Sequence, residues 1–268
     1  MAETDDGATR RPGEDTSNTS TQGYNWNEVI AHMKANKIES GLWLTRICSV
    51  FFSILFIFPI TGGNPQSYYQ KALISNAATS ALRLHQRLPN FQMSREFFTQ
   101  MFQEDSCHYL FFSLILMTVY PMTMALVPIF LFALLHASSF TRALLDKLGP
   151  NSLQLVRNLI GKLDGQQVSI LRFVACTEIF IMPTSIFMIF TGRASLLFPF
   201  LYYRFLSLRY TSRRNPYCRT LFWELRMTIE HLVNKPQCPQ AVRNLTFKGI
   251  AFVNRLAPTY VTQQQQQQ

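Results

Sequence analysis

Apolar residues along this chain are concentrated in long runs, and the runs follow one another in pairs. The first pair covers residues 42–60 and 68–84, and the last covers 173–191 and 194–209. Between them lies one apolar stretch that Pro121 divides, because proline lacks a backbone donor and clashes with the preceding turn. Runs of this length and composition are typical of helices that lie in a membrane. The pattern predicts an all-α integral membrane protein.

Two membrane topologies agree with this pattern, and the positions of the basic residues distinguish between them. If the runs fold as helical hairpins, at about 42–84, 96–141 and 173–210, the hairpin tips carry only Lys71 and Arg193. The other 23 of the 25 Lys and Arg residues then lie at the opposite ends of the hairpins or beyond them. Basic residues concentrate on the cytosolic side of a membrane. The charge distribution therefore predicts about six membrane-embedded segments and cytosolic N- and C-termini.

Hydropathy alone favours the alternative of three spans, at 42–60, about 109–136 and 173–191. In that topology ten Lys and Arg residues lie on one side of the membrane and fifteen on the other, which is a weaker asymmetry. Hairpin segments of about 13 to 21 residues measure roughly 20 to 30 Å, at or below the apolar thickness of about 30 Å. Such segments suit the thin endoplasmic reticulum membrane, or a position in only part of a bilayer.

The polar stretches divide the chain into further parts. Residues 1–30 carry six acidic and two basic residues and indicate a disordered acidic tail, which precedes a membrane hairpin domain at 31–210. Within that domain, the periodicity of the linker at 142–172 predicts a cytosolic amphipathic helix. Residues 211–260 predict basic amphipathic C-terminal helices, and 261–268 form a Gln-rich tail.

Composition supports a membrane location and indicates what kind of partner the chain binds. Hydrophobic residues make up 48% of the chain and charged residues 15%, below the roughly 25% charged content of soluble domains. The positive charges, +10 net, flank the apolar runs, so anionic lipid headgroups are the first expected partner. We expect no direct nucleic-acid binding, because there is no zinc-finger spacing and the aromatic residues lie inside apolar runs.

The densest basic segment includes the end of the last apolar run, where arginines alternate with tyrosines. Tyrosine prefers a membrane interface and arginine binds phosphates in bidentate fashion, so the segment predicts a lipid-headgroup patch. The alternative is that these arginines only set the topology, or pair with acidic residues on other helices. They are Arg204, Arg209, Arg213, Arg214 and Arg219.

Beyond this cluster, two stretches separated by Pro236 and Pro239 repeat apolar residues with helical spacing, while basic residues lie on other faces. Such helices either lie in the plane of a membrane or pack on the protein's own membrane helices, and the pattern leaves both interpretations open. The apolar positions include Leu221, Phe222, Leu225 and Ile229 in the first stretch and Leu245, Ile250 and Val253 in the second.

One ionisable residue, Glu178, lies deep in an apolar run. Charged groups inside a membrane either pair with one another or mark a transport path, and a transporter usually shows more of them. A structural ion pair is therefore the favoured interpretation of Glu178. Nearer the predicted hairpin ends, three ionisable residues share one helix face and could meet Arg46 or Arg87; they are Glu104, Asp105 and His108.

The sequence lacks the common catalytic motifs. It contains no phosphate-binding glycine loop, dinucleotide fingerprint, nucleophile elbow or zinc-protease motif. The five cysteines are odd in number and lack metal-ligand spacing. We therefore expect neither an enzyme nor a cofactor or metal site. Cys218, beside the basic cluster, is a candidate acylation site, with an unmodified thiol as the alternative.

Several stretches resemble the transmembrane protein 33 family, which includes pore membrane protein 33. They include ALRLHQRLPNFQ at 81–92, EDSCHYLFFSLI at 104–115 and FPFLYYRFLSLRYTSRRNPYCRTLFWELR at 198–226. The resemblance implies a multi-pass protein of the endoplasmic reticulum membrane and nuclear envelope, with reticulons and nuclear pore proteins as partners. It also implies roles in tubular membrane organisation, nuclear pore distribution and stress or calcium signalling. The family offers no catalytic residues to carry over.

These features together predict a membrane organiser, whose hairpins and amphipathic helices favour curved reticulum and nuclear envelope membrane. Two alternatives stay open. Small residues at 72–81 let helices approach closely, which fits a scaffold or regulatory subunit for reticulons, pore components or channels. The other alternative is an ion or lipid transporter centred on Glu178.

Overall fold

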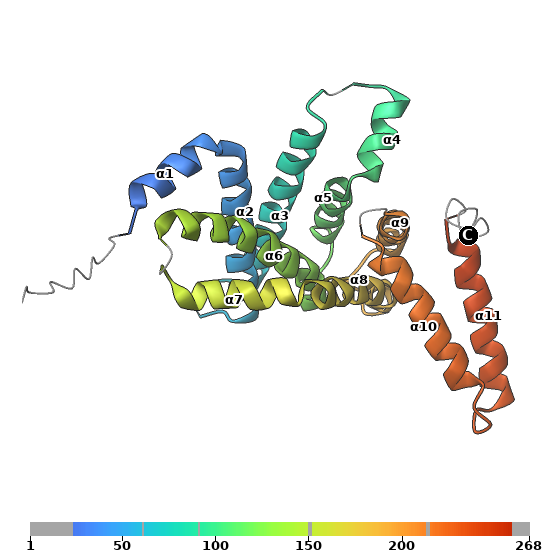
Figure 1. The fold of residues 1–268 in the computed structure, drawn as a ribbon. Helices are drawn as coiled ribbons and strands as arrows, with labels where there is room; N and C mark the ends of the chain where they lie inside the picture. Colours follow the sequence, from blue (N-terminus) through green and yellow to red (C-terminus); the bar gives the residue numbers. More distant parts are fainter. Residues whose placement is uncertain (1–23, 61, 91, 150–151, 213–214, 259–268) are drawn as a thin grey trace, which may run out of the picture.

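The structure is a computed structural model that describes residues 24–60, 62–90, 92–149, 152–212 and 215–258. These residues form eleven helices and no strand (Figure 1), so the expected all-α class is confirmed. The helices are α1 (Trp26–Ala35), α2 (Lys37–Ile57), α3 (Pro65–Arg87), α4 (Arg95–Gln103), α5 (Asp105–Leu116), α6 (Thr123–Leu148), α7 (Gln154–Gly165), α8 (Gln167–Phe190), α9 (Leu197–Thr211), α10 (Tyr217–Val233) and α11 (Gln240–Leu256).

Among the described helices, three are long and apolar enough to cross a membrane, namely α2, α6 and α8. The 21 residues of α2 correspond to about 32 Å of helix, which matches an apolar thickness of about 30 Å. The 12 residues of α5 give only about 18 Å, and α3 is too polar along its length. The chain is thus an all-helical membrane protein with three candidate spans, and the arrangement of six embedded segments stays a prediction.

The breaks between the paired helices lie where the sequence predicts turns. α3 begins directly after Asn64, whose side chain accepts a hydrogen bond from a backbone N–H of the first turn at 2.9 Å. Pro65 occupies the first helical position, where its missing donor costs nothing. α5 ends before the Tyr120–Pro121 pair and α6 begins after it. Proline and capping chemistry therefore determine these boundaries locally.

The three predicted tips lie at one end of the helix bundle. Tyr120 in the second tip donates a backbone hydrogen bond to the carbonyl of Arg193 in the third, with N and O 3.4 Å apart. The Arg193 guanidinium also lies 5.3 Å from the centre of the Tyr120 ring. Beside the first tip, the rings of Phe56 and Tyr69 are 5.5 Å apart. Both side chains pack in the core cluster that contains Val119, which lies next to the second tip. The tips therefore share one side of the molecule.

Helix packing is not confined to the paired helices. α2 packs on α3 and α6, and α3 packs on α5. The two helices that flank Pro121 have different main neighbours, since α5 packs on α3 and α9 whereas α6 packs on α2 and α8. The main core lies between these helices, and its largest fully buried apolar side chains include Tyr69, Phe112, Phe198, Tyr202 and Phe205.

The helix expected in the linker is folded against the bundle. Ile160 of α7 packs with Leu144 of α6 and Val29 of α1 in a second buried cluster. Residues 142–148, at the start of the expected linker, continue α6 instead, because their apolar side chains belong to that cluster. The apolar face of α7 is therefore directed at the protein itself.

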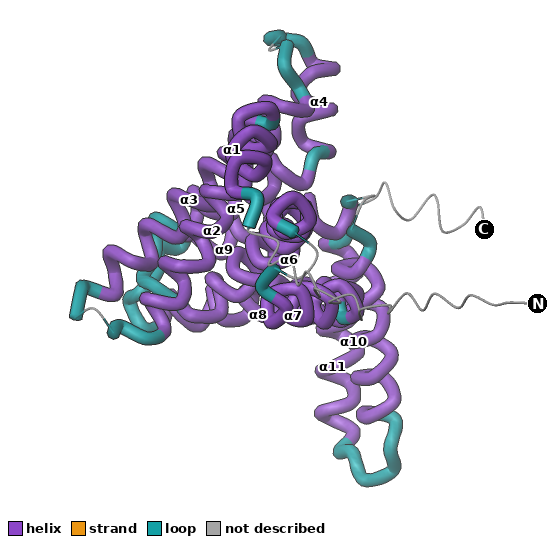
Figure 2. The backbone as a smooth tube through the Cα atoms, turned by 60° about the vertical axis from the view of Figure 1, so that its left-hand side comes forward, coloured by secondary structure: helices purple, strands orange, loops and turns teal. Residues whose placement is uncertain are grey.

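α10 and α11 form a helical hairpin that projects from the bundle (Figures 1 and 2). The hairpin is attached where α10 packs on α8. α11 has no buried residue and contacts α10. The Tyr203 hydroxyl donates to the Leu256 carbonyl at 2.8 Å and links the end of α11 to α9.

Candidate functional site: a buried ionic network

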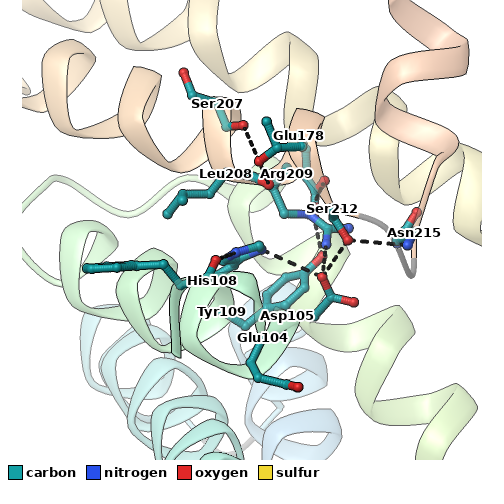
Figure 3. A network of polar contacts seen from close by, with 12 residues as sticks. Glu104, Asp105, His108, Tyr109, Glu178, Ser207, Leu208, Arg209, Ser212 and Asn215 are labelled. Carbon is teal, nitrogen blue, oxygen red and sulfur yellow. Dashed lines mark hydrogen bonds and ion pairs between the residues drawn. The ribbon is translucent and has the colours of Figure 1, made fainter. Parts of the chain in front are cut away.

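The most deeply buried charges of the described chain form one ion pair. Glu178 in the middle of α8 and Arg209 in the last turn of α9 have fully buried side chains. The Arg209 Nε donates to Glu178 Oε2 at 3.0 Å (Figure 3). A second carboxylate, that of Asp105 at the start of α5, lies 3.3 Å from Arg209 Nη1. One guanidinium therefore joins α5, α8 and α9.

Two tyrosines complete the surroundings of Glu178. Tyr109 donates its hydroxyl to Glu178 Oε1, and Tyr202 donates to the Glu178 backbone carbonyl at 2.8 Å. The Tyr109 ring centre also lies 5.1 Å from the Arg209 guanidinium carbon, within the range of a cation–π interaction. Both carboxylate oxygens of Glu178 are thus occupied by donors from other helices, which a buried charge requires.

The Asp105 side of the network holds the chain that follows α9. Ser212 Oγ donates to Asp105 Oδ1 at 2.7 Å and accepts from the Asn215 backbone N–H at 3.3 Å. His108 lies one turn after Asp105, with its Nδ1 3.6 Å from the carboxylate. The His108 Nε2 donates to the carbonyl of Phe102 at 2.7 Å. Ser212, at the end of α9, is therefore joined both to Asp105 at the start of α5 and to Asn215 just before α10.

This arrangement is suited to holding helices together. Glu178 is inaccessible to solvent, and its charge is balanced by Arg209. Removing one partner of such a pair leaves an uncompensated buried charge and costs about 3–5 kcal/mol. The geometry is that of a structural ion pair, the interpretation that the sequence favours over a transport path.

The structure pairs the acidic residues at the start of α5 with different arginines. Arg87 binds Glu104 at 2.6 Å, which is one of the contacts that the sequence suggests. Asp105 binds Arg209 instead of Arg46 or Arg87. Consecutive residues of a helical turn point about 100° apart, so two adjacent carboxylates face different helices.

The tyrosines and Ser212 of this network were not predicted from the sequence. The available signal was spacing, since Asp105 and Tyr109 are four residues apart on one helix face. Tyr202 and Arg209 are seven apart and share a face of α9 in the same way. Spacing shows which residues share a face, but not which helix that face meets.

The arginines of the predicted headgroup patch do not form one surface. Arg209 departs from that expectation because it lies on the buried face of α9. Arg204 is exposed, with its guanidinium 5.5 Å from an aromatic ring one turn earlier, and Arg219 is half-buried. Arg213 and Arg214 lie outside the described residues. A headgroup role therefore stays a prediction for Arg204 and Arg219.

The apolar positions of α10 and α11 divide into two groups. Those in the first half of α10 are half-buried against α8 and α9, and they are Leu221, Phe222 and Leu225. The apolar positions in the second half of α10 and in α11 are mostly exposed, namely Ile229, Leu245 and Val253. Ile250 of α11 is half-buried. Packing on the protein applies to the first group, and contact with a membrane stays open for the second.

Cys218 lies in the first turn of α10 and is fully buried. Burial raises the pKa of its thiol to about 12, because the thiolate would lose its hydration there. The thiolate is the nucleophilic form of cysteine. This environment therefore disfavours acylation of Cys218.

Comparisons with known proteins identify the family of this chain. A family model described as Transmembrane protein 33/Nucleoporin POM33 matches residues 21–259. Transmembrane protein 33 of Homo sapiens is 55% identical over 232 residues, which cover 86% of this chain and 94% of the human protein. Krueppel homolog 2 of Drosophila melanogaster is 45% identical over 231 residues, covering 86% of this chain and 83% of that protein. No solved structure matches the chain. The chain therefore belongs to the transmembrane protein 33 family of membrane proteins.

Proposed function

We propose that this protein organises curved membrane of the endoplasmic reticulum and nuclear envelope. The observation that carries the proposal is the exposed apolar surface of the α10–α11 hairpin. Trp223, Leu245 and Phe252 are 61%, 72% and 62% exposed there. Large apolar side chains gathered on a projecting element mark an interaction surface.

A lipid surface is the occupant that fits this hairpin. Basic side chains lie beside the apolar ones on the same two helices, including Arg226, Lys248 and Arg255. Apolar residues flanked by cations are typical of helices that lie at the surface of an anionic membrane. The hairpin is also attached directly to α8, a candidate span, which keeps it close to the bilayer. Inserting it into the cytosolic leaflet would expand that leaflet and bend the membrane toward the cytosol.

The test uses the full-length protein reconstituted into vesicles that contain anionic lipid, with vesicle shape recorded by electron microscopy. We expect the protein to produce narrow tubules or small vesicles. Leu245→Glu places a charge in the exposed apolar surface of α11 and should reduce tubulation strongly, because the glutamate resists insertion.

Asn254→Glu is the matched control, since Asn254 is nine residues from Leu245 and lies on the opposite side of α11. It adds the same charge and should leave tubulation unchanged. Vesicles that keep their shape with the unmodified protein, or an equal loss in both variants, would contradict the proposal.

A scaffold for other membrane proteins is the second candidate function. α3 buries its small and polar residues Ala72 and Ser80 against its neighbours, while Ile74 and Ala81 stay exposed. This outer face is available to another membrane helix, and the nucleoporin name of the family suggests a pore component as partner. Reticulons are a further partner that the resemblance suggests. Ala81→Trp should then abolish co-purification of the partner, and intact co-purification would argue against this face.

A further inference from the structure

A basic cavity lies beside the buried network, between α2, α3, α5, α6 and α9. Its volume is about 190 Å³. Among the residues that line it, Asp105 supplies the single carboxylate. Against this one acid stand the guanidinium groups of Arg46, Arg83, Arg87 and Arg209. Three of these arginines already pair with acids outside the lining, Arg83 with Glu39, Arg87 with Glu104 and Arg209 with Glu178, which leaves Arg46 as the lining arginine without a bound acid among the described residues.

Arg46 is the first indication that the cavity receives a ligand. Its side chain is only 6% exposed, yet within the described part of the chain its guanidinium forms neither a hydrogen bond nor an ion pair. Glu39, an acid that interacts with it electrostatically, is already bound by Arg83 at 3.4 Å and Gln86 at 2.9 Å. A largely buried guanidinium with no directly bound acid and no hydrogen-bond acceptor is unfavourable, so a bound anion would stabilise it.

Arg209 is a second, independent indication that the cavity receives a ligand. Its Nε and Nη1 atoms are occupied by the carboxylates of Glu178 and Asp105. Its Nη2 atom is also buried but has no hydrogen-bond acceptor among the described residues. Native proteins satisfy nearly all buried donors, so each exception needs an explanation. Two fully or nearly buried arginines that line one cavity thus have donors without an acceptor among the described residues.

We propose that this cavity binds a phosphate group, carried either by the headgroup of an anionic membrane lipid or by a soluble phosphate ester. Arginine forks match phosphate oxygens in bidentate geometry. Ser80 and Ser106 also line the cavity, and their hydroxyls are further candidate donors, whereas the Thr79 hydroxyl already donates to the Ser75 carbonyl. A peptide carboxylate has only two oxygens and one charge, whereas a phosphate monoester offers three acceptor oxygens and up to two charges.

The size and place of the cavity agree with a headgroup. Its volume of about 190 Å³ is below the roughly 300–1,000 Å³ of pockets that enclose a whole small molecule. Arg83 and Arg87 lie in the last turns of α3, and Arg209 in the last turn of α9. These are the helix ends opposite the tips, on the side that the basic residues predict to be cytosolic. The inference does not depend on the proposed membrane-shaping role.

The experiment measures ligand binding to the full-length protein through the shift of its thermal unfolding midpoint, since a ligand that binds the folded state stabilises it. In one arm the protein is in phosphatidylcholine nanodiscs with increasing phosphatidic acid. In the other it is in detergent with increasing inositol trisphosphate. We expect a saturable rise in at least one arm. A rise with lipid alone identifies a headgroup site, and a rise with the soluble ester alone identifies a soluble ligand.

Arg46→Gln separates the cavity from general attraction to a basic protein. This variant should fold at least as stably as the unmodified protein without ligand, because an unpaired charge is removed. It should bind phosphate roughly tenfold or more weakly, since a charged hydrogen bond is lost. Arg83→Gln provides a second, more exposed variant with the same expectation if Arg46→Gln does not fold.

Arg142→Gln is the matched control. Arg142 also lies toward the non-tip end of α6, pairs with Asp164 at 2.5 Å, and does not line the cavity. It should retain the affinity of the unmodified protein. The proposal is overturned by no saturable rise in either arm, by unchanged affinity in the cavity variants, or by an equal loss in Arg142→Gln. Binding of an acidic peptide without any response to phosphate would also overturn it.

Discussion

At the scale of single residues, Arg209 and Arg204 show how similar positions acquire different roles. Both lie on α9 in the same basic segment, yet Arg204 is exposed and Arg209 is fully buried. Their separation of five residues turns them to different sides of the helix. Arg209 is tolerated inside the protein because Glu178 and Asp105 accept its hydrogen bonds. The role of each arginine therefore depends on what its helix face meets.

Glu178→Gln should lower the free energy of unfolding by about 3 kcal/mol, because it leaves Arg209 buried with only one carboxylate. Unfolding of the detergent-purified protein measures the loss. The double variant with Arg209→Gln should recover part of it, since neither charge then remains unpaired. Glu230→Gln, which breaks the surface pair with Arg226, is the control and should cost no more than about 0.5 kcal/mol. Equal effects of the two glutamate variants would refute a structural role for the buried pair.

Cys218 should resist alkylation in the folded protein at neutral pH. Its thiol is fully buried and the pKa is raised to about 12, so the reactive thiolate is scarce. The measurement compares maleimide labelling of two variants that each retain one cysteine, either Cys218 or the partly exposed Cys238. We expect rapid labelling of Cys238, and labelling of Cys218 only after unfolding. Rapid labelling of both would show that α10 detaches from α8.

At the scale of elements, apolar periodicity predicts α10 and α11 to within a few residues, because each has a clear apolar stripe, whereas α7 covers only the middle of the predicted linker at 142–172. The sequence does not single out α4, which has nine residues and no buried side chain. Helices shorter than about 12 residues are marginal in isolation. A local contact supports it, since Ser94 Oγ accepts from the Phe97 backbone N–H at 3.1 Å.

Ser94→Ala should loosen α4 without affecting the rest of the protein. Loss of the cap costs about 1 kcal/mol, which corresponds to roughly fivefold faster amide exchange within α4. Hydrogen–deuterium exchange measured by mass spectrometry tests this. Ser94→Asp retains an acceptor at the cap and should exchange at the original rate. Faster exchange throughout the bundle would mean that α4 supports the whole fold.

At the scale of the whole molecule, the helix arrangement and the charge distribution distinguish the same two ends of the helix bundle. The tips around Tyr120 and Arg193 contact one another, and the basic residues gather toward the other end. Apolar length selects only α2, α6 and α8 as candidate spans. The six-segment and three-span topologies differ in where they place the chain between α2 and α5 and in where they place the chain after α8.

Glycosylation mapping distinguishes the two topologies. An acceptor site in an extended tip near Asn64 should be modified in the reticulum lumen, whereas one in an extended loop near Asn90 should not, because the hairpin topology returns α3 to the cytosolic side. The natural sequon at Asn244 should also stay unmodified. Modification near both Asn64 and Asn90 would support three spans with a cytosolic N-terminus.

The sequence by itself determined that this is a helical membrane protein, where its turns lie and on which side its basic residues gather. Those properties follow from local hydrophobicity, from proline and from charge. Only the tertiary structure decided that Arg209 pairs with Glu178 and Asp105, that the first half of α10 packs on the bundle, and that four arginines surround one cavity. These features join helices far apart in the chain. Their contacts depend on how each helix is rotated against its neighbours, which periodicity within one helix does not specify.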